Sequence, residues 1–257
     1  MPERLLAFDT STDVLSVAVR HGDRVLSHSG AGGARSSTTL IPLIQQMLRD
    51  AGLTLGTLDA IAFGRGPGSF TGLRTACAVA QGLAFGAGLR LLPVDTLAAV
   101  ADEARHRFGA RQVVAVLDAR MDQVYAARYD FDAPAGVVAV EPELLAPEAV
   151  DVPAGWALAG NAFAAYGTRL PDACARHEVL PTAEAILRLA PALLAAGRDV
   201  APADAWPLYV RDKVAQTTEE RAALKAATSA TTTAATLAAS AVPTATPAIA
   251  HDHERRS

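Results

Sequence analysis

The residues whose chemistry comes nearest to catalysis are carboxylates at two turns. Asp9 and Asp118 each follow a short apolar stretch, and Asp9 leads into Thr10 and Ser11. In a fold with a cleft between two halves, carboxylates at strand ends can face a metal-bound nucleotide, so these four residues form a candidate vestigial nucleotide cleft. Alternatively, each Asp accepts hydrogen bonds from amides of its own turn. The residues alone leave both interpretations open.

Other catalytic equipment is sparse. The only close pair among the six histidines is His251 and His253, whereas a helical metal site needs ligands at i and i+4 or a comparable cluster. No G-x-S-x-G motif accompanies the serines. Cys77 and Cys174 belong to no metal or C-x-x-C pattern, which favours a reducing compartment. We expect no catalytic residue, no metal and no cofactor in this chain; ATP-magnesium is an option in a larger complex but is not expected here.

A glycine-rich junction joins an apolar stretch at 58–63 to an uncharged one at 75–89. Glycines allow positive φ angles and close backbone approach, so we expect the junction to act through its shape. It is not a Walker A loop and lacks the G-x-G-x-x-G order. A bound phosphate is the alternative, since Ser69 and free helix amides would lie there. The junction comprises Gly64, Gly66, Pro67, Gly68, Ser69, Thr71, Gly72 and Arg74, and Arg74 is expected to reach loop carbonyls or a carboxylate.

The hydrophobic pattern predicts the elements that hold these residues. Apolar stretches predict strands and stripes of period 3.6 predict helices. The strands expected first lie at 5–8, 14–20, 58–63 and 91–94, with another beginning at Val25. Helices are expected at 39–51, at 70–86 and from about 96 to 105. Thr38 or Thr39 should cap the first helix, which puts Pro42 in its first turn. Asp95 or Thr96 should cap the third.

Residues 113–125 repeat the plan of the opening segment: strand, Asp, a second Asp, strand. Asp118 falls opposite Asp9, and Asp122 falls opposite Asp13. Such an echo also arises by chance, because strand-Asp-turn-strand is common. The better interpretation is two halves of one plan.

The remaining sequence is less regular. Strands are predicted at 137–140, 156–159 and 179–180, a helix at 182–196 with a kink or break at Pro191, and a packed segment at 207–211. We divide the chain into a first half at 1–108, a second half at 109–220 and a tail at 221–257. The tail is dominated by Ala, Thr and Pro, so we predict that it is disordered.

Charge and length exclude some functions. The formal net charge is −4 and no run of Lys or Arg stands out, which argues against a stand-alone nucleic-acid binder. The apolar stretch after the N-terminus is too short for a signal peptide. The stretch at 75–89 falls short of the ~20 residues of a membrane helix. We therefore expect a soluble, cytoplasmic protein that makes no membrane contact.

The helices at 39–51 and 70–86 carry more apolar surface than one core-facing stripe requires, since no charge occurs between 75 and 89. We predict that they expose a patch that binds a partner protein, or a second copy when the partner is absent. The residues assigned to this patch are Leu40, Leu43, Ile44, Met47, Leu73, Val79 and Leu83.

Several segments resemble the TsaB (YeaZ) family over residues 4 to about 214. The segments are LLAFDTST, GRGPGSFTGLR, VDTL at 94–97, LDAR-x-x-x-VY at 117–125, and PLYVR at 207–211. The resemblance implies an α/β, actin-like (ASKHA, RNase H-like) fold of two duplicated halves. Where relatives often have a histidine before the first long helix, this chain has Ser36-Ser37-Thr38.

The resemblance also implies a function. It suggests a non-catalytic subunit of the complex that forms threonylcarbamoyladenosine at position 37 of tRNA. The implied partners are a TsaD-type catalytic subunit and a TsaE-type ATPase, with tRNA contacted through the complex. Two other classes stay open: an actin-like enzyme that hydrolyses ATP with Asp9 and Asp118, and a glycoprotease-like peptidase.

Overall fold

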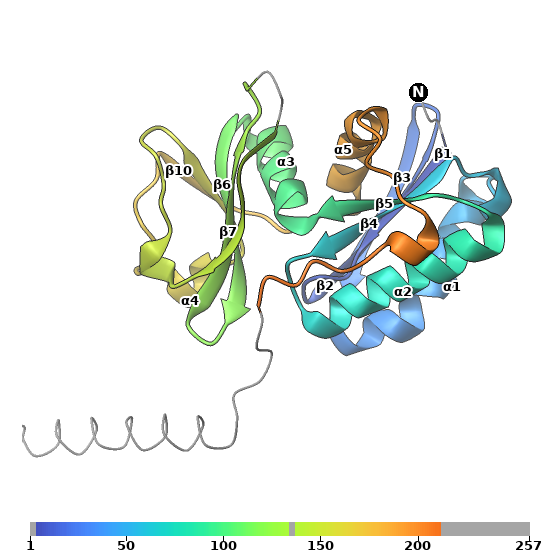
Figure 1. Cartoon of the computed structure of the whole chain (residues 1–257), viewed down its shortest axis with the longest axis horizontal. Coiled ribbons are helices and arrows are strands. Elements are labelled where there is room, and N and C mark those ends of the chain that lie inside the picture. The colour runs from blue at the N-terminus through green and yellow to red at the C-terminus, as the bar shows by residue number, and fades with distance from the viewer. Residues whose placement is uncertain (1–3, 134–136, 212–257) are drawn as a thin grey trace, which may run out of the picture. The chain divides into compact units, whose positions relative to one another are not determined.

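The structure is a computed structural model that describes residues 4–133 and 137–211. These residues belong to one compact unit of the chain, Met1–Asp212. Two five-stranded sheets form its framework (Figure 1). The predicted disordered tail at 221–257 lies outside the described residues, and the boundaries proposed at 108 and 220 stay predictions.

The first sheet has the strand order β3-β2-β1-β4-β5. Strands β1 to β3 form an antiparallel meander, and β4 and β5 run parallel to β1. The strands are β1 (Arg4–Asp9), β2 (Val14–His21), β3 (Arg24–Ala31), β4 (Ala60–Gly66) and β5 (Leu91–Asp95). The helices of this half are α1 (Ser36–Asp50), α2 (Phe70–Ala87) and α3 (Thr96–Phe108).

The second sheet has the order β10-β9-β6-β7-β8. Again a three-stranded meander is followed by two parallel strands. The strands are β6 (Gln112–Arg120), β7 (Gln123–Asp130), β8 (Val137–Leu145), β9 (Ala157–Gly160) and β10 (Ala175–Glu178), and the helices are α4 (Phe163–Tyr166) and α5 (Ala183–Ala195). The matching order and directions confirm the predicted α/β fold of two duplicated halves, which fits the actin-like arrangement.

Two details of α1 and α5 differ from the predictions. Helix α1 begins at Ser36, so Thr38 and Thr39 do not cap it; their hydroxyls donate to the carbonyl of Arg35 at 3.0 and 2.9 Å. The 3-10 turn Gly33–Arg35 runs directly into α1, and Pro42 therefore lies inside the helix. Helix α5 starts as expected at Thr182, whose hydroxyl accepts from the amide of Ala185. It continues unbroken through Pro191, with buried residues packed on its inner face.

Two predictions for neighbouring segments are also wrong. The last strand is β10 at Ala175–Glu178, not 179–180, because its parallel register with β9 ends there. Asp95 precedes α3 but makes no side-chain cap, since its carboxylate instead pairs with Arg65.

The core has three layers of apolar side chains. The central layer lies between the two sheets and includes α3 and α5. A second layer joins the outer face of the first sheet to α1 and α2, which lie side by side (Figure 1). A third covers the outer face of the second sheet beside α4.

Helices α3 and α5 tie the halves together. Helix α3 closes the first half yet packs on β6, β7 and β9, whereas α5 closes the second half yet packs on β1 and β2. An ion network joins them: Arg188 donates to buried Asp102 at 2.6 Å and to Glu103 at 2.7 Å. The terminal helix of each half thus covers the sheet of the other.

Candidate functional site: a glycine junction sealed over an aspartate turn

The glycine junction lies directly on the turn that follows β1. The hydroxyl of Thr10 donates to the carbonyl of Gly72 at 2.7 Å, and the amide of Ser69 donates to the carbonyl of Ser11 at 2.7 Å. Both bonds join backbone segments about 60 residues apart in the chain. These two hydrogen bonds therefore hold the glycine junction against the turn that contains Thr10 and Ser11.

Close approach explains the glycines of the junction. A Cβ added at Gly64 would lie 1.8 Å from Asp9 Oδ2, and one at Gly72 would lie 1.8 Å from the carbonyl oxygen of Thr10. At Gly68 the added atom would lie 2.6 Å from the carbonyl oxygen of Ser11. At Gly66 the added atom would lie 2.7 Å from the carbonyl oxygen of Leu208, and this glycine also has a φ of 118° and a cis peptide bond to Pro67. The junction's shape thus depends mainly on the lack of side chains facing the turn.

Asp9 is fully buried beneath this junction. Its Oδ1 accepts from the amide of Ser11 at 2.9 Å and from the hydroxyl of Ser11 at 2.6 Å. Desolvation raises the pKa of Asp9 to about 6, against the lowering effect of these hydrogen bonds. The carboxylate therefore accepts bonds from its own turn, and Gly64 occupies the space beside Oδ2.

Asp118 holds the equivalent position in the second half but is partly exposed. Its Oδ1 accepts from the amide of Arg120 at 2.7 Å and from the hydroxyl of Tyr166 at 3.1 Å. Each Asp thus accepts from the amide two residues further on. No hydrogen bond or ion pair joins Asp9 to Asp118 in residues 4–133 and 137–211; the halves meet nearby through Arg120 and Asp13 at 3.3 Å.

The polar residues of the junction bond differently from the predictions. Ser69 occupies the N-cap position of α2, but its hydroxyl makes no cap bond. Among the residues that the structure describes, Arg74 contacts no loop carbonyl and no carboxylate. Its Nε donates to the hydroxyl of Tyr209 at 3.1 Å, and its guanidinium lies 3.8 Å from the ring centroid of Phe70. Arg74 therefore lies between an aromatic ring of its own helix, Phe70, and one of the 207–211 segment, Tyr209, because that segment runs past the start of α2.

The segment at 207–211 is packed, as predicted. The amide of Leu208 donates to the carbonyl of Arg65 at 2.7 Å, next to Gly66. Arg211 donates to the carbonyl of Ala119 at 2.9 Å, at the end of β6 next to the turn into β7. Three residues of that turn have positive φ angles: Arg120, Met121 and Asp122. The segment therefore links the junction of the first half to the turn of the second.

The predicted partner patch needs a correction. Leu40, Ile44 and Met47 are buried in the layer beneath α1 and α2, and Leu73 is buried beside Gly66. Leu43, Val79 and Leu83 are partly buried against the same layer. The period-3.6 stripe identified the inner faces of these helices, because apolar residues at that spacing face the core first. These side chains hold the helices in place, and most of them lie off the surface.

The outer faces of the helices carry other apolar residues, which the sequence reasoning missed. Phe85 is 83% exposed on α2, Ile41 is 40% exposed on α1, and nearby Trp206 is 69% exposed. Gly82 and Gly86 on α2 have no atom within 4 Å of an added Cβ. The signal available was an isolated aromatic between two glycines, out of phase with the stripe.

Neither a cluster of metal ligands nor a membrane-spanning helix occurs among the described residues. In residues 4–133 and 137–211, no three His, Cys, Asp or Glu side chains gather to hold a metal ion. Within the same part of the chain, no helix has the length and apolar character needed to cross a bilayer.

Comparisons with known proteins agree with this geometry. The family model described as "TsaD: tRNA N6-adenosine threonylcarbamoyltransferase" matches residues 31–245. The "tRNA threonylcarbamoyladenosine biosynthesis protein TsaB" of Escherichia coli is 35% identical, covering 82% of this chain and 96% of that protein. The Haemophilus influenzae protein of that name is 47% identical over 47% of this chain and 51% of its own.

A solved structure, YeaZ from Pseudomonas aeruginosa, superposes with a TM-score of 0.76 at 41% identity, covering 80% of this chain and 99% of that one. Fold and family match together define a two-half α/β protein of the wider family that the TsaD model describes. Within it, the chain belongs to the TsaB (YeaZ) family.

Proposed function

We propose that this protein is a subunit of the machinery that makes threonylcarbamoyladenosine in tRNA, and that it supports a TsaD-type catalytic subunit without catalysing the transfer itself. Its relatives carry the name of that biosynthesis. The proposal implies a cytoplasmic location, since the modified tRNA is used there. Contact with tRNA would come through the complex.

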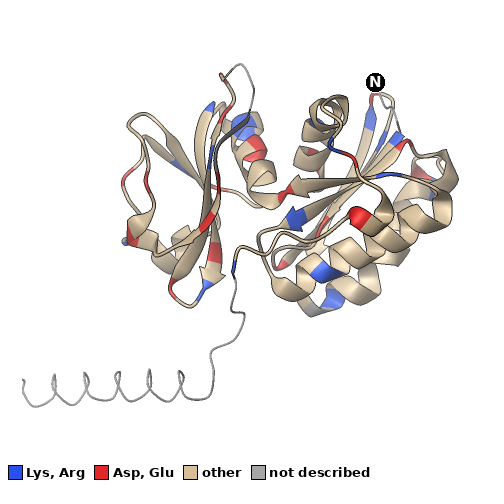
Figure 2. Cartoon of the chain, viewed as in Figure 1, with Lys and Arg blue, Asp and Glu red and all other residues tan. Residues whose placement is uncertain are grey.

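The observation that carries the scaffold role is the outer face of α2. This helix contains one charged residue, Arg74, and is almost entirely tan in Figure 2. Gly82 and Gly86 each cost about 1 kcal/mol in a helix interior relative to Ala, and no close contact with a residue that the structure describes requires them. They flank exposed Phe85. A closely approaching partner helix would account for both the glycines and the aromatic.

A charge at Phe85 tests this surface. Phe85→Glu should abolish co-elution with a TsaD-type partner, because it places a carboxylate in an apolar contact, while the melting temperature stays within a few degrees of wild type. Val25→Glu is the matched control, since Val25 is 41% exposed on β3 of the same half. Unchanged co-elution of Phe85→Glu would contradict the proposed surface, as would equal loss in both variants.

The supporting role has its own test. The purified chain, incubated with tRNA and threonylcarbamoyl-AMP, should form no product, and adding the TsaD-type protein should restore the reaction. Product from the chain alone would refute the non-catalytic role. We further propose that isolated chain binds no ATP-magnesium at Asp9, because the junction covers that carboxylate. Calorimetric titration with ATP-magnesium checks this.

A further inference from the structure

The segment at 205–211, orange in Figure 1, contains no helix or strand and runs from α2 in the first half to the end of β6 in the second. We call it the strap. Because it belongs to no helix and no sheet, its backbone depends on bonds to other elements. Its position is therefore set by a few anchors, and each anchor lies on a different element.

The first anchor of the strap lies on α2. The carbonyl of Ala205 accepts from Gln81 Nε2 at 3.0 Å and from Cys77 Sγ at 3.3 Å, and Ala205 itself is fully buried. Gln81 lies one helical turn before the exposed Phe85, and Trp206, the next residue of the strap, is 69% exposed. The strap therefore begins within the α2 face that we propose as a partner surface.

The middle of the strap is fixed on the glycine junction. The amide of Leu208 donates to the carbonyl of Arg65 at 2.7 Å, and a Cβ added at Gly66 would lie 2.7 Å from the carbonyl oxygen of Leu208. Val210 is partly buried against the central apolar layer. Closely packed segments transmit a displacement because they compress little. A shift at one end of the strap is therefore passed along to the other.

The last anchor is Arg211, which bonds to the end of β6 where the turn into β7 begins. Its Nη2 donates to the carbonyl of Ala119 at 2.9 Å and to that of Arg120 at 3.3 Å. Residues 120–122 have φ angles between 56° and 61°, a left-handed conformation that residues with a Cβ avoid, and none of them is glycine. Such a turn depends on bonds from outside it, and the strap supplies two of them.

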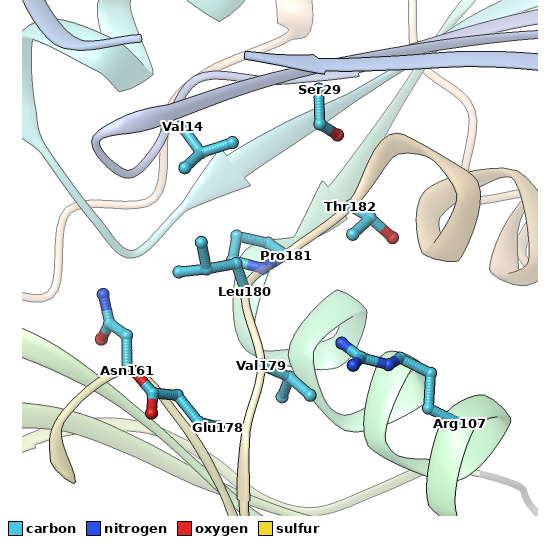
Figure 3. Close-up of a pocket in the computed structure, with 9 residues that line it drawn as sticks. All are labelled: Val14, Ser29, Arg107, Asn161, Glu178, Val179, Leu180, Pro181 and Thr182. Carbon is cyan, nitrogen blue, oxygen red and sulfur yellow. The ribbon is translucent and has the colours of Figure 1, made fainter. Parts of the chain in front are cut away.

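The boundary between the halves is open beside the strand that leads into this turn. A cavity of about 330 Å³ lies there, and Figure 3 shows Val14 of β2 and Asn161 on opposite sides of it. Asn161 Oδ1 accepts from the amide of Asp118 at 2.9 Å, two residues before Arg120. Because packed side chains do not fill this space, the end of β6 has room to move when the strap releases it.

We propose that the strap docks and releases as one unit, and that it couples the outer face of α2 to the turn at 120–122. A partner that covers Trp206 holds the start of the strap in place and thereby keeps the turn of the other half ordered. When the strap releases, the turn loses the bonds from Arg211. The coupling is a property of the isolated chain; only the identity of the partner that uses it rests on the proposed function.

Hydrogen–deuterium exchange of the full-length chain, followed amide by amide by NMR, tests the coupling without any partner. Gln81→Met removes the anchor on α2, which lies in the other half from the turn. The amide of Arg120, bonded to Asp118 in wild type, should then exchange about tenfold faster or more, because the strap that supports its turn is released more often. Gln46→Met is the matched control, since Gln46 bonds within its own helix, and it should exchange as wild type does.

Arg211→Met tests the same coupling from the other end of the strap. It should speed exchange at Arg120 and also at the amide of Leu208, because coupling between two sites is reciprocal. An unchanged Arg120 amide in Gln81→Met would overturn the proposal, as would an unchanged Leu208 amide in Arg211→Met. Equal acceleration of the amides between β1 and β2 would also overturn it, since the whole fold, not the strap, would then be opening.

Discussion

The two halves share a sheet but differ in what covers it. In the first half, α1 and α2 cover the outer face and the glycine junction seals the turn after β1. In the second half, the equivalent connections are reduced to the 3-10 turn Pro147–Ala149 and the short helix Phe163–Tyr166. The turn after β6 is left at the surface. Sheet order survives the loss of helices because the strands and terminal helices define the central core.

The largest losses of stability are expected where each half packs its backbone against a glycine. In Gly160→Ala the new Cβ would lie 1.7 Å from the carbonyl oxygen of Val116, at a φ of 146°. In Gly72→Ala it would lie 1.8 Å from that of Thr10. Each should lower the free energy of unfolding by about 4 kcal/mol or more, through strain and overpacking. Denaturant unfolding measures both losses.

Gly82→Ala is the control for these two substitutions. No atom lies within 4 Å of its Cβ, so the variant should be neutral or more stable by up to about 1 kcal/mol. Equal destabilisation at Gly72 and Gly82 would show that helix conformation, not close approach, explains the glycines of α2.

The ion network between α3 and α5, which links the two halves, should be the next most sensitive to substitution. Arg188→Met removes the cation shared by Asp102 and Glu103, and among the described residues it leaves Arg105 as the one cation paired with buried Asp102. We expect a loss of about 3 to 4 kcal/mol, since one partner of a buried ion pair is left uncompensated. A double-mutant cycle with Asp102→Leu should recover part of it. Additive losses would contradict this account.

The burial of Asp9 beneath the glycine junction should make the free energy of unfolding depend on pH. The pKa of Asp9 is raised from 3.8 to about 6 in the folded protein, so the folded state binds the proton more tightly than the unfolded state. Asp9 therefore favours the folded state below about pH 4, and this contribution falls as pH rises towards 6. Its loss amounts to about 2 to 3 kcal/mol.

Asp9→Asn should remove this fall while keeping the acceptor for Ser11. Urea unfolding of wild type and variant between pH 4 and 7 gives the comparison. Parallel curves for the two proteins would show that Asp9 is not desolvated by the junction.

The smallest expected effect concerns the segment that joins the halves. Tyr209→Phe keeps the ring beside Phe70 but removes the exposed hydrogen bond from Arg74. Thermal unfolding should show a loss of about 0.5 to 1 kcal/mol. A loss several times larger would mean that the hydroxyl, not the ring packing, anchors the segment.

Sequence reasoning found features that repeat or break local rules. The echo of Asp9 in Asp118 predicted the duplication, and the clustered glycines predicted a shaped junction. The prediction of the partner surface failed because an apolar stripe on a helix can face either the core or a partner. A stripe such as Leu40, Ile44 and Met47 predicts an amphipathic helix but cannot separate the core-facing side from a docking face when both are apolar.

Ion pairs between residues far apart in the chain could not be predicted from the sequence. Arg188 and Asp102 are 86 residues apart, and no local pattern indicates that their helices cross between halves. Element boundaries shifted at α1 and β10, where the neighbouring turn or strand set the limit.

The exchange of terminal helices has a consequence for how the protein is made. A nascent chain completes all five strands of the first sheet by Asp95 and α3 by Phe108, but α5, which packs on β1 and β2, ends at Ala195. During synthesis, the apolar face of β1 and β2 that α5 covers therefore stays uncovered while some hundred further residues are added. Apolar residues such as Leu5 and Leu92 stay available to chaperones over that interval. The packing of the first half is therefore complete only when most of the second half has been synthesised.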